Sequence, residues 1–142
     1  MAITMHVDIV SAEESIFSGT ASFLLARSTD GELGVMPRHV PLLAQLQPGE
    51  VMLRDEFDEE HFYYASGGII EVQPQVVTVL ADTASRARDL DEAAAQEAKK
   101  RAEQAIENRS GEIDYARAQA ELAEAAAQLR TIQSLRRRKG HT

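Results

Sequence analysis

Short apolar runs rich in β-branched and aromatic residues alternate with turn residues through the first part of the chain. Between Thr4 and Val10, apolar Val7 and Ile9 alternate with polar neighbours, as a strand with one buried face requires. The gaps between runs are too short for crossover helices, so we expect antiparallel pairing. The predicted strands are Thr4–Val10, Ala21–Ala26, Val51–Leu53, Phe62–Ala65, Ile69–Val72 and Val76–Leu80. This pattern indicates an antiparallel β-sandwich or flattened barrel.

The second part of the chain has the periodicity of helices. From Asp89 onward it consists mostly of strong helix formers, and Asp89 followed by Glu92 has the spacing of a capping box. Because Asn108–Gly111 interrupts the pattern, we predict two helices, Leu90–Glu107 and Ile113–Arg137, folded into an antiparallel hairpin. The apolar stripes are Leu90, Ala94, Ala98, Ala102, Ala105 and Ile106 on the first helix, and Leu122, Ala125, Ala126, Leu129 and Ile132 on the second.

The seam of the predicted hairpin is mainly alanine, which removes little apolar surface from water. Apolar burial stabilises by about 25 cal/mol per Å², whereas ordering each residue costs roughly 1–2 kcal/mol of backbone entropy. The folded-back hairpin is therefore only weakly stabilised. We hypothesise that it can detach from the rest of the chain and extend.

Composition changes at the same place as the periodicity. All four prolines and six of the eight glycines precede residue 86, and the basic residues of that part are Arg27, Arg38 and Arg54. The sequence therefore predicts an α+β protein with two domains. We expect a β-sandwich over residues 1–86 and a helical hairpin over residues 87–142.

The overall composition excludes several classes of protein. No apolar run of the 142 residues approaches the roughly 18 that a membrane-spanning helix needs, and the chain contains no cysteine. A net charge of −8 argues against binding nucleic acid through its phosphates. The first residues lack the basic region of a signal or transit peptide, so we expect neither.

The sequence contains no recognisable catalytic or cofactor motif. P-loop, dinucleotide-binding, HExxH and nucleophile-elbow patterns are absent, so we predict no catalytic residues and no bound metal. The acidic run from Asp55 to His61 is the densest group of metal-ligating residues, but it lacks the glycine and the acid spacing of a calcium loop. We interpret it as a solvated turn.

Two segments are less well explained by ordinary structural roles. The segment Gly31–Leu43 combines apolar residues with two prolines, and irregular loops of this kind often carry contacts. The run Arg136–Lys139 ends the second predicted helix, with Arg130 shortly before it. These cations suit the helix dipole, and they would equally suit an acidic segment of another protein.

A series of short stretches along the chain has the order and spacing of one known family. These are Val10–Glu13, Phe17–Gly19, Gly31–Gly34, Pro37, His39, Pro41–Leu43, Pro48–Gly49, Ser66–Ile69, Glu71–Pro74, Val77–Asp82 and Leu90–Glu92. Each stretch is short, but together they are specific. Through them the chain resembles, along its whole length, the epsilon subunit of bacterial rotary (F-type) ATP synthase.

The resemblance implies a non-catalytic subunit of the proton-translocating rotor. In that family a β-sandwich at the foot of the central stalk touches the gamma subunit and the ring of membrane c subunits. A helical hairpin can rise into the catalytic head of alpha and beta subunits and inhibit ATP hydrolysis. The implied function is to couple c-ring rotation to gamma and to restrain hydrolysis. The implied location is peripheral, at the cytoplasmic face of the bacterial inner membrane.

The resemblance also assigns contacts to particular residues. The loops of the c-ring would face Glu32 and the segment comprising Arg38, His39, Val40, Pro41 and Leu42, where the family has glycine in place of Arg38. Ser11 would lie toward gamma. The inhibitory contact with a beta subunit would use Arg130, Arg136, Arg137 and Arg138.

The family also has an ATP-binding motif from which this chain departs. In some members the motif is Ile or Leu, Asp, two variable residues, Arg and Ala, with a further Arg on the same helix. This chain has Leu90, Asp91, Ala95 and the distal Arg101, but Ala94 stands in place of the motif arginine. Because alanine cannot supply the donors of a guanidinium, we expect weak or absent ATP binding and no bound cofactor.

Two other functions remain open from the residues alone. One is a free-standing adaptor outside any ATPase, whose sandwich binds one partner and whose hairpin binds another. The other is a metal-dependent hydrolase that uses the run Asp55–His61. Co-purification with gamma would separate the stalk subunit from the adaptor, and the hydrolase requires metal-dependent turnover by the isolated chain.

Overall fold

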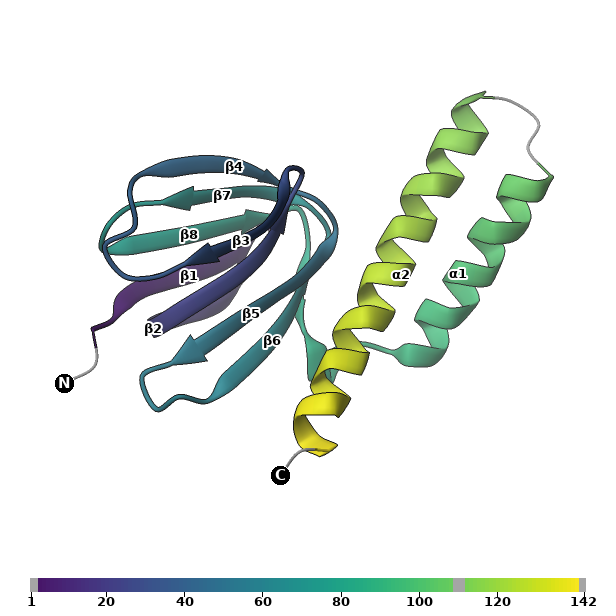
Figure 1. The fold of residues 1–142 in the computed structure, drawn as a ribbon. Helices are drawn as coiled ribbons and strands as arrows, with labels where there is room; N and C mark the ends of the chain where they lie inside the picture. Colours follow the sequence, from purple (N-terminus) through teal and green to yellow (C-terminus); the bar gives the residue numbers. More distant parts are fainter. Residues whose placement is uncertain (1–2, 109–111, 141–142) are drawn as a thin grey trace.

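The computed structural model describes residues 3–108 and 112–140, with side chains for 3–108 and 115–137. They form a β-sandwich and a hairpin of two helices that stands beside it (Figure 1). The strands are β1 (Met5–Ser11), β2 (Ser15–Ser28), β3 (Gly31–Val35), β4 (Leu42–Leu46), β5 (Gly49–Asp55), β6 (Glu60–Ala65), β7 (Gly68–Val72), β8 (Val76–Ala81) and β9 (Ala84–Arg86). A 3-10 helix, η1 (Ala87–Asp89), leads into α1 (Glu92–Glu107) and α2 (Glu112–Gly140). The predicted α+β class is confirmed.

The long strand β2 joins the two layers of the sandwich. The strand order is β1-β8-β7-β4-β2-β5-β6-β9, with β3 and β1 also paired to β2. The first half of β2 pairs with β1 and its second half with β3 and β5, and its register to β5 shifts between Ala21 and Phe23. Such an irregularity bends a strand, which lets β2 belong to both layers.

One pairing differs from the antiparallel arrangement that the sequence predicts. β1 and β8 are parallel, from His6 opposite Val76 to Ser11 opposite Ala81. The prediction is wrong here because short gaps along the chain exclude parallel pairing only between consecutive strands. β1 and β8 are separated by six other strands, which supply the long connection that a parallel pair requires.

Every predicted strand is present with shifted ends, but the prediction lacks β3, β4 and β9. β3 contains two glycines, β4 follows a segment with two prolines, and β9 has only three residues. These features are typical of turns, so local pattern does not indicate strands there. Pairing with distant strands stabilises them, since β3 pairs with β2, β4 with β7, and β9 with β6.

The core of the sandwich is independent of the helices. Leu24, Leu53 and Ile70 are fully buried, as are Val7 and Ile9, which the alternation in the first strand predicts. The whole cluster lies between residues 5 and 84. The sandwich therefore has the apolar core that a separately stable domain needs.

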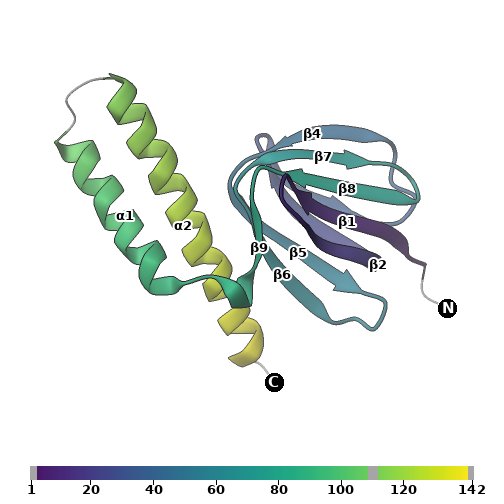
Figure 2. The ribbon, with the colours of Figure 1, turned by 180° about the vertical axis from the view of Figure 1, so that it is seen from behind.

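α1 and α2 lie side by side in both views (Figures 1 and 2), and α2 also packs on β5 and β6. Asp91 caps α1, because its carboxylate accepts a hydrogen bond from the backbone N–H of Ala94 at 3.1 Å. The predicted cap, Asp89, is wrong, since Asp89 ends η1. Residues 109–111, part of the predicted break between the helices, lie outside the described residues. No described helix is long and apolar enough to cross a membrane.

α2 is buried on more sides than its predicted stripe. Ala125 and Ile132 of that stripe are buried, but so are Ala127, Thr131 and Ser134, which the stripe does not include. The additional burial arises because α2 packs on both α1 and the sandwich. A single apolar stripe predicts packing against one neighbouring element only.

The buried seam of α1 also differs from the prediction. Ala95 and Ala102 are buried, and Ala98 is half-buried, whereas Ala94 and Ala105 are exposed and were wrongly assigned to the seam. Alanine occurs on several sides of this helix. The distribution of apolar residues therefore does not define the packed face.

Candidate functional site

The acidic turn between β5 and β6 is built around Asp55. Its Oδ1 accepts hydrogen bonds from the backbone N–H groups of Phe57 at 2.8 Å and Glu59 at 3.0 Å, and His61 Nε2 lies 2.8 Å from Oδ2. Burial opposes ionisation of Asp55, but the hydrogen bond from His61 and those from the backbone outweigh it and lower the pKa of the carboxyl. Asp55, Glu59 and His61 are close enough to share a metal ion. Because the Asp55 oxygens already close the turn, we interpret the group as structural.

A serine, an aspartate and a histidine meet on the surface of β1 and β2. Ser18 Oγ donates to Asp8 Oδ1 at 2.7 Å, and His6 Nε2 lies 3.0 Å from the same oxygen. In a catalytic triad one ring nitrogen of the histidine faces the serine and the other faces the carboxylate, whereas here His6 Nε2 lies near both, 3.4 Å from Ser18 Oγ. The serine donates to the carboxylate, which lowers the pKa of Asp8. The cluster therefore lacks the geometry of a catalytic triad.

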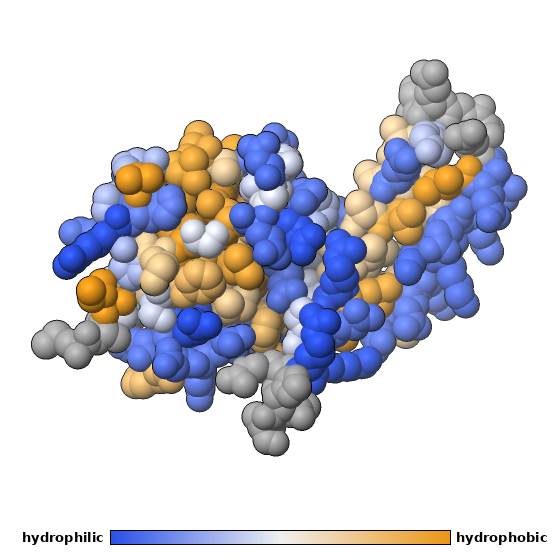
Figure 3. Space-filling model, in the orientation of Figure 1, coloured by the Kyte–Doolittle hydropathy of each residue, from blue (hydrophilic) through white to orange (hydrophobic). Residues whose placement is uncertain are grey.

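The outer surface of β4, β7 and β8 exposes large apolar side chains. Leu43 is 67% exposed, Ile69 44% and Leu80 49%, and Val76 is exposed at the start of β8. Ile69 and Leu80 are direct cross-strand neighbours. Figure 3 shows apolar surface over β4 and β7 at the top of the sandwich. We call Leu43, Ile69, Val76 and Leu80 the outer apolar face, and such a patch is typical of a protein-binding surface.

The outer apolar face was not predicted from the sequence, although one strand carries a signal for it. The run Val76–Ala81 is apolar at every position except Thr78. A strand with one face in water should alternate, so a continuous apolar run indicates that both faces are covered. In this chain the hairpin packs on β5 and β6, so it does not cover the outer face of β8.

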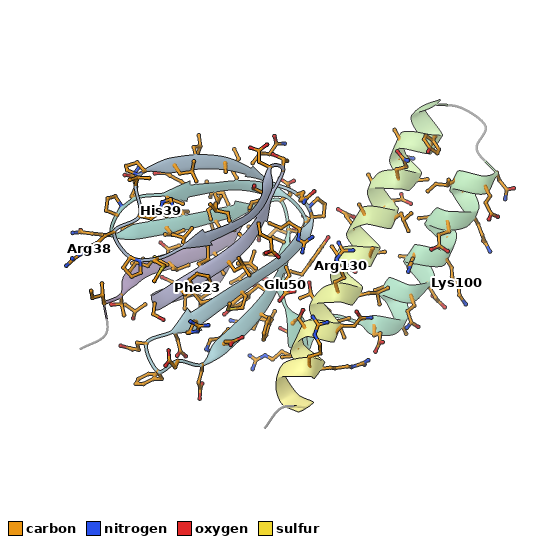
Figure 4. All side chains as sticks on the ribbon, in the orientation of Figure 1. Phe23, Arg38, His39, Glu50, Lys100 and Arg130 are labelled. Carbon is orange, nitrogen blue, oxygen red and sulfur yellow. The ribbon has the colours of Figure 1, made fainter. Side chains whose placement is uncertain are left out.

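The loop Met36–Pro41, which we call the tip loop, lies at the end of the sandwich away from the hairpin (Figure 4). Val40 is 71% exposed. Arg38 has a φ of 68°, a left-handed conformation that glycine adopts most easily, and its backbone N–H donates to the Pro74 carbonyl at 2.8 Å. The structure therefore brings together Arg38, His39, Val40, Pro41 and Leu42, the residues assigned to the c-ring by resemblance.

Glu32 lies apart from that group, near the opposite end of β3. Glu32 Oε1 is 3.5 Å from Arg27 Nη2, and both residues line a small hollow with Glu50. About 10 Å of strand separates Glu32 from Val35, beyond which the tip loop begins. The structure does not join Glu32 and the tip loop into one surface.

Ser11 ends β1 in a tight turn. Its backbone N–H donates to the Glu14 carbonyl at 2.9 Å, and its Oγ accepts from the N–H groups of Glu13 and Glu14 at 3.4 Å. Ser11 is paired with Ala81, the residue after Leu80. Ala81 is buried, and Leu80 of the outer apolar face is paired with Val10, the residue before Ser11. Ser11 is therefore next to that face along the chain, but its position in the strand is in phase with the inner face.

The arginines of α2 differ in how they are held. Arg136 donates from both terminal nitrogens to the carboxylate of Glu92, whereas Arg137 donates to a hydroxyl of its own helix at 3.1 Å. Arg130 is exposed and makes no hydrogen bond or ion pair with another described residue. The side chain of Arg138 lies outside the described residues.

The residues of the incomplete ATP motif lie at the start of α1. Asp91 uses its carboxylate as the helix cap, Ala95 is buried, and Leu90 is half-buried between η1 and α1. Ala94 and Arg101 are exposed and two helical turns apart, so they lie on the same side of α1. Arg101 is thus the cation that remains on that side of the motif.

Comparison with known families matches both parts of the chain. Residues 4–87 match the family described as ATP synthase, Delta/Epsilon chain, beta-sandwich domain. Residues 88–133 match ATP synthase, Delta/Epsilon chain, long alpha-helix domain.

Two bacterial relatives match over nearly their full length, and two chains of solved structures share the fold. An ATP synthase epsilon chain of Nitrosococcus oceani is 63% identical, over 99% of this chain and 100% of the relative. One of Alkalilimnicola ehrlichii is 65% identical, over 95% and 96%. A chain from the Euglena gracilis mitochondrial ATP synthase, OSCP/F1/c-ring, has a TM-score of 0.80 at 21% identity, covering 87% of this chain and 78% of that one. One from the Tetrahymena thermophila mitochondrial ATP synthase, central stalk/c-ring, has a TM-score of 0.57 at 13% identity, covering 92% and 95%.

Proposed function

Because the chain belongs to the family of ATP synthase epsilon chains, we propose that it works as a non-catalytic subunit of the central stalk. In this role it couples rotation of the c-ring to the gamma subunit and restrains ATP hydrolysis by the head of alpha and beta subunits. The bacterial relatives named ATP synthase epsilon chain support this, since they match over almost their whole length. Proteins of the same fold occur in structures titled F1/c-ring and central stalk.

The outer apolar face is the observation that carries the proposal. Leu43, Ile69 and Leu80 expose apolar area in water, and a partner subunit that covers them gains the free energy of burying it. Ser11, assigned to gamma by resemblance, directly follows Val10, the residue paired with Leu80 of this face. We therefore assign the outer apolar face to gamma.

The tip loop is proposed to contact the c-ring. Its cation Arg38 and the neighbouring His39 suit the polar loops of a membrane ring, and the loop lies at the end of the sandwich away from the hairpin (Figure 4). This placement leaves the hairpin room to move away from the ring. Glu32, at the other end of β3, would make a separate contact with the ring.

The hairpin is proposed to supply the restraint on hydrolysis. Arg130, Arg136, Arg137 and Arg138 would meet an acidic segment of a beta subunit, and α2 would have to leave the sandwich to reach it.

We place the complex at the cytoplasmic face of the bacterial inner membrane, and this subunit is peripheral to the membrane as part of it. ATP would bind the incomplete motif weakly or not at all, because Ala94 offers no guanidinium.

The test is purification of the tagged full chain after mixing with ATP synthase stripped of its own epsilon chain. Gamma and the c-ring should co-purify with it. Leu43→Asp should strongly reduce the amount of gamma retained, because it places a charge in the outer apolar face. The matched control Phe57→Asp places the same charge on a 77% exposed residue of the β5–β6 turn and should retain both partners. Purification of the wild-type chain without gamma would refute the stalk role and favour the free-standing adaptor.

A further inference from the structure

The last turns of α2 are held at two points by carboxylates from other elements. We propose that Glu92 of α1 and Glu50 of β5 are the resting partners of the arginines at the end of α2, and that an acidic segment of another subunit must replace them before the hairpin can inhibit. This inference rests on the proposed braking function. It names the contacts that keep the hairpin folded back.

Glu92 binds Arg136 through two hydrogen bonds. Arg136 Nη1 donates to Oε1 at 3.1 Å, and Nη2 donates to Oε2. Two parallel N–H···O bonds are the geometry in which arginine recognises a carboxylate. A carboxylate on another protein would need the same two donors. Arg136 therefore cannot bind Glu92 and an acidic partner in this way at once.

Glu50 is linked to α2 through Ser134. Ser134 Oγ donates to Glu50 Oε2 at 2.7 Å, and Arg137 Nη2 donates to Ser134 Oγ at 3.1 Å. Burial raises the pKa of Glu50, while the hydrogen bond from Ser134 and the charges of Arg137 and Arg27 oppose that rise. Figure 4 shows Glu50 at the edge of the sandwich that faces α2. The contact joins the sandwich to the same end of α2 that Glu92 binds.

Part of the remaining contact between α2 and the sandwich involves small side chains, and Leu135 also lines a hollow with Phe62 and Tyr63 of β6. Ala127 and Thr131 are fully buried and share a helix face with Ser134, the residue that reaches Glu50. Thr131 Oγ1 donates within its own helix, to the Ala127 carbonyl at 2.8 Å. Because apolar stabilisation scales with the area buried, these residues contribute little. The polar contacts of Glu50 and Glu92 therefore act together with this modest apolar contact in holding α2 in place.

Arg130 provides an internal comparison. It lies on the same helix as Arg136 but has no hydrogen-bonding or ionic partner among the described residues. Removing Arg130 should weaken the contact with an acidic partner and leave the folded-back hairpin unchanged. Removing the charge of Glu92 should loosen the folded-back hairpin and leave the arginines that contact the acidic partner in place. The two variants thus separate holding the hairpin from inhibiting the head.

The resting contacts are measured by energy transfer in the isolated full chain. The chain contains no cysteine, so dyes can be attached at the exposed positions Glu13→Cys in the sandwich and Ala123→Cys on α2. We expect Glu92→Gln and Glu50→Gln each to raise the detached fraction about 2- to 5-fold, and the double variant to raise it further. The matched control Glu97→Gln, an exposed position on α1, should have no effect. Wild-type energy transfer in the double variant would overturn the inference.

The consequence is measured as inhibition of ATP hydrolysis by a catalytic head that lacks its own epsilon chain. Glu92→Gln and Glu50→Gln should lower the concentration of chain needed for half-inhibition by about 2- to 5-fold. Arg130→Ala should raise that concentration without changing energy transfer. If the wild-type chain inhibits and both glutamate variants inhibit at the wild-type concentration, the inference is wrong. If the wild-type chain does not inhibit, the braking function fails, while a change in energy transfer in the variants still supports the resting contacts.

Discussion

Replacing Leu43 with threonine measures the contribution of the outer apolar face to docking. Leu43 is 67% exposed, so about two-thirds of its side chain is available to a partner. Complete burial of a leucine side chain contributes about 1.5–3 kcal/mol, and the available part about 1–2 kcal/mol. Because about 1.4 kcal/mol corresponds to tenfold in affinity, Leu43→Thr should weaken docking on gamma by about 5- to 30-fold.

The same substitution should change the stability of the isolated chain only slightly. The buried third of Leu43 contributes less than about 1 kcal/mol, and threonine is well suited to a strand. In a chain of this length, about 1 kcal/mol lowers Tm by about 2–4 °C. A small change in Tm together with a large change in affinity would show that the residue acts in docking rather than in folding.

The assay is isothermal titration of a catalytic head that contains gamma but lacks its epsilon chain. The wild-type chain should bind with a negative heat-capacity change, which reports apolar burial, and Leu43→Thr should reduce its size. Phe57→Ser, which removes an exposed apolar side chain from the β5–β6 turn, is the matched control and should bind like the wild type. Unchanged affinity of Leu43→Thr, or an equal loss in Phe57→Ser, would refute the assignment of the outer apolar face.

Three further outcomes follow from local geometry. Gly68→Ala should lower Tm strongly, because Gly68 has a φ of 131° and an added Cβ would lie 2.1 Å from the Leu80 carbonyl oxygen; an unchanged melting curve would contradict this close approach. Asp55→Asn should lower Tm at pH 7, since the lowered pKa of Asp55 means that its carboxylate stabilises the fold above the ordinary carboxyl range. The difference from the wild type should shrink as the pH falls through that lowered pKa, and a difference that stays constant to pH 2 would argue against it. Titration with ATP should give no micromolar binding, because Ala94 replaces the motif arginine, and such binding in a calorimeter would show that other residues supply the missing donors.

The parts of the fold that sequence could predict are those in which local pattern and tertiary contacts agree. Val7 and Ile9 alternate with polar residues and are buried in the strand they predict. The two helices follow from helix-forming composition, and the ordered stretches from Val10 to Glu92 identify the family, which the comparisons confirm. Both features can be read along the chain without knowing which strands are neighbours.

The parts that could not be predicted depend on distant neighbours. The parallel pairing of β1 with β8 is set by how the sandwich closes, and the buried face of α2 is widened by the sandwich beside it. The Glu50–Ser134 hydrogen bond joins residues 84 positions apart, for which no local pattern exists. Glu32 and Arg38 are close in sequence, yet β3 holds them at opposite ends. The sequence could therefore indicate which residues belong to the candidate site, but only the fold shows which of them share a surface.

The most direct test of the central claim compares the full chain with residues 1–88. The shorter form keeps the whole core of the sandwich, which lies between residues 5 and 84. Both forms are titrated into a catalytic head that contains gamma and lacks its epsilon chain, and binding and ATP hydrolysis are followed together. We predict that both forms bind through the outer apolar face and that only the full chain lowers turnover. Failure of both forms to bind would contradict the stalk role, and equal inhibition by both would contradict the hairpin as the brake.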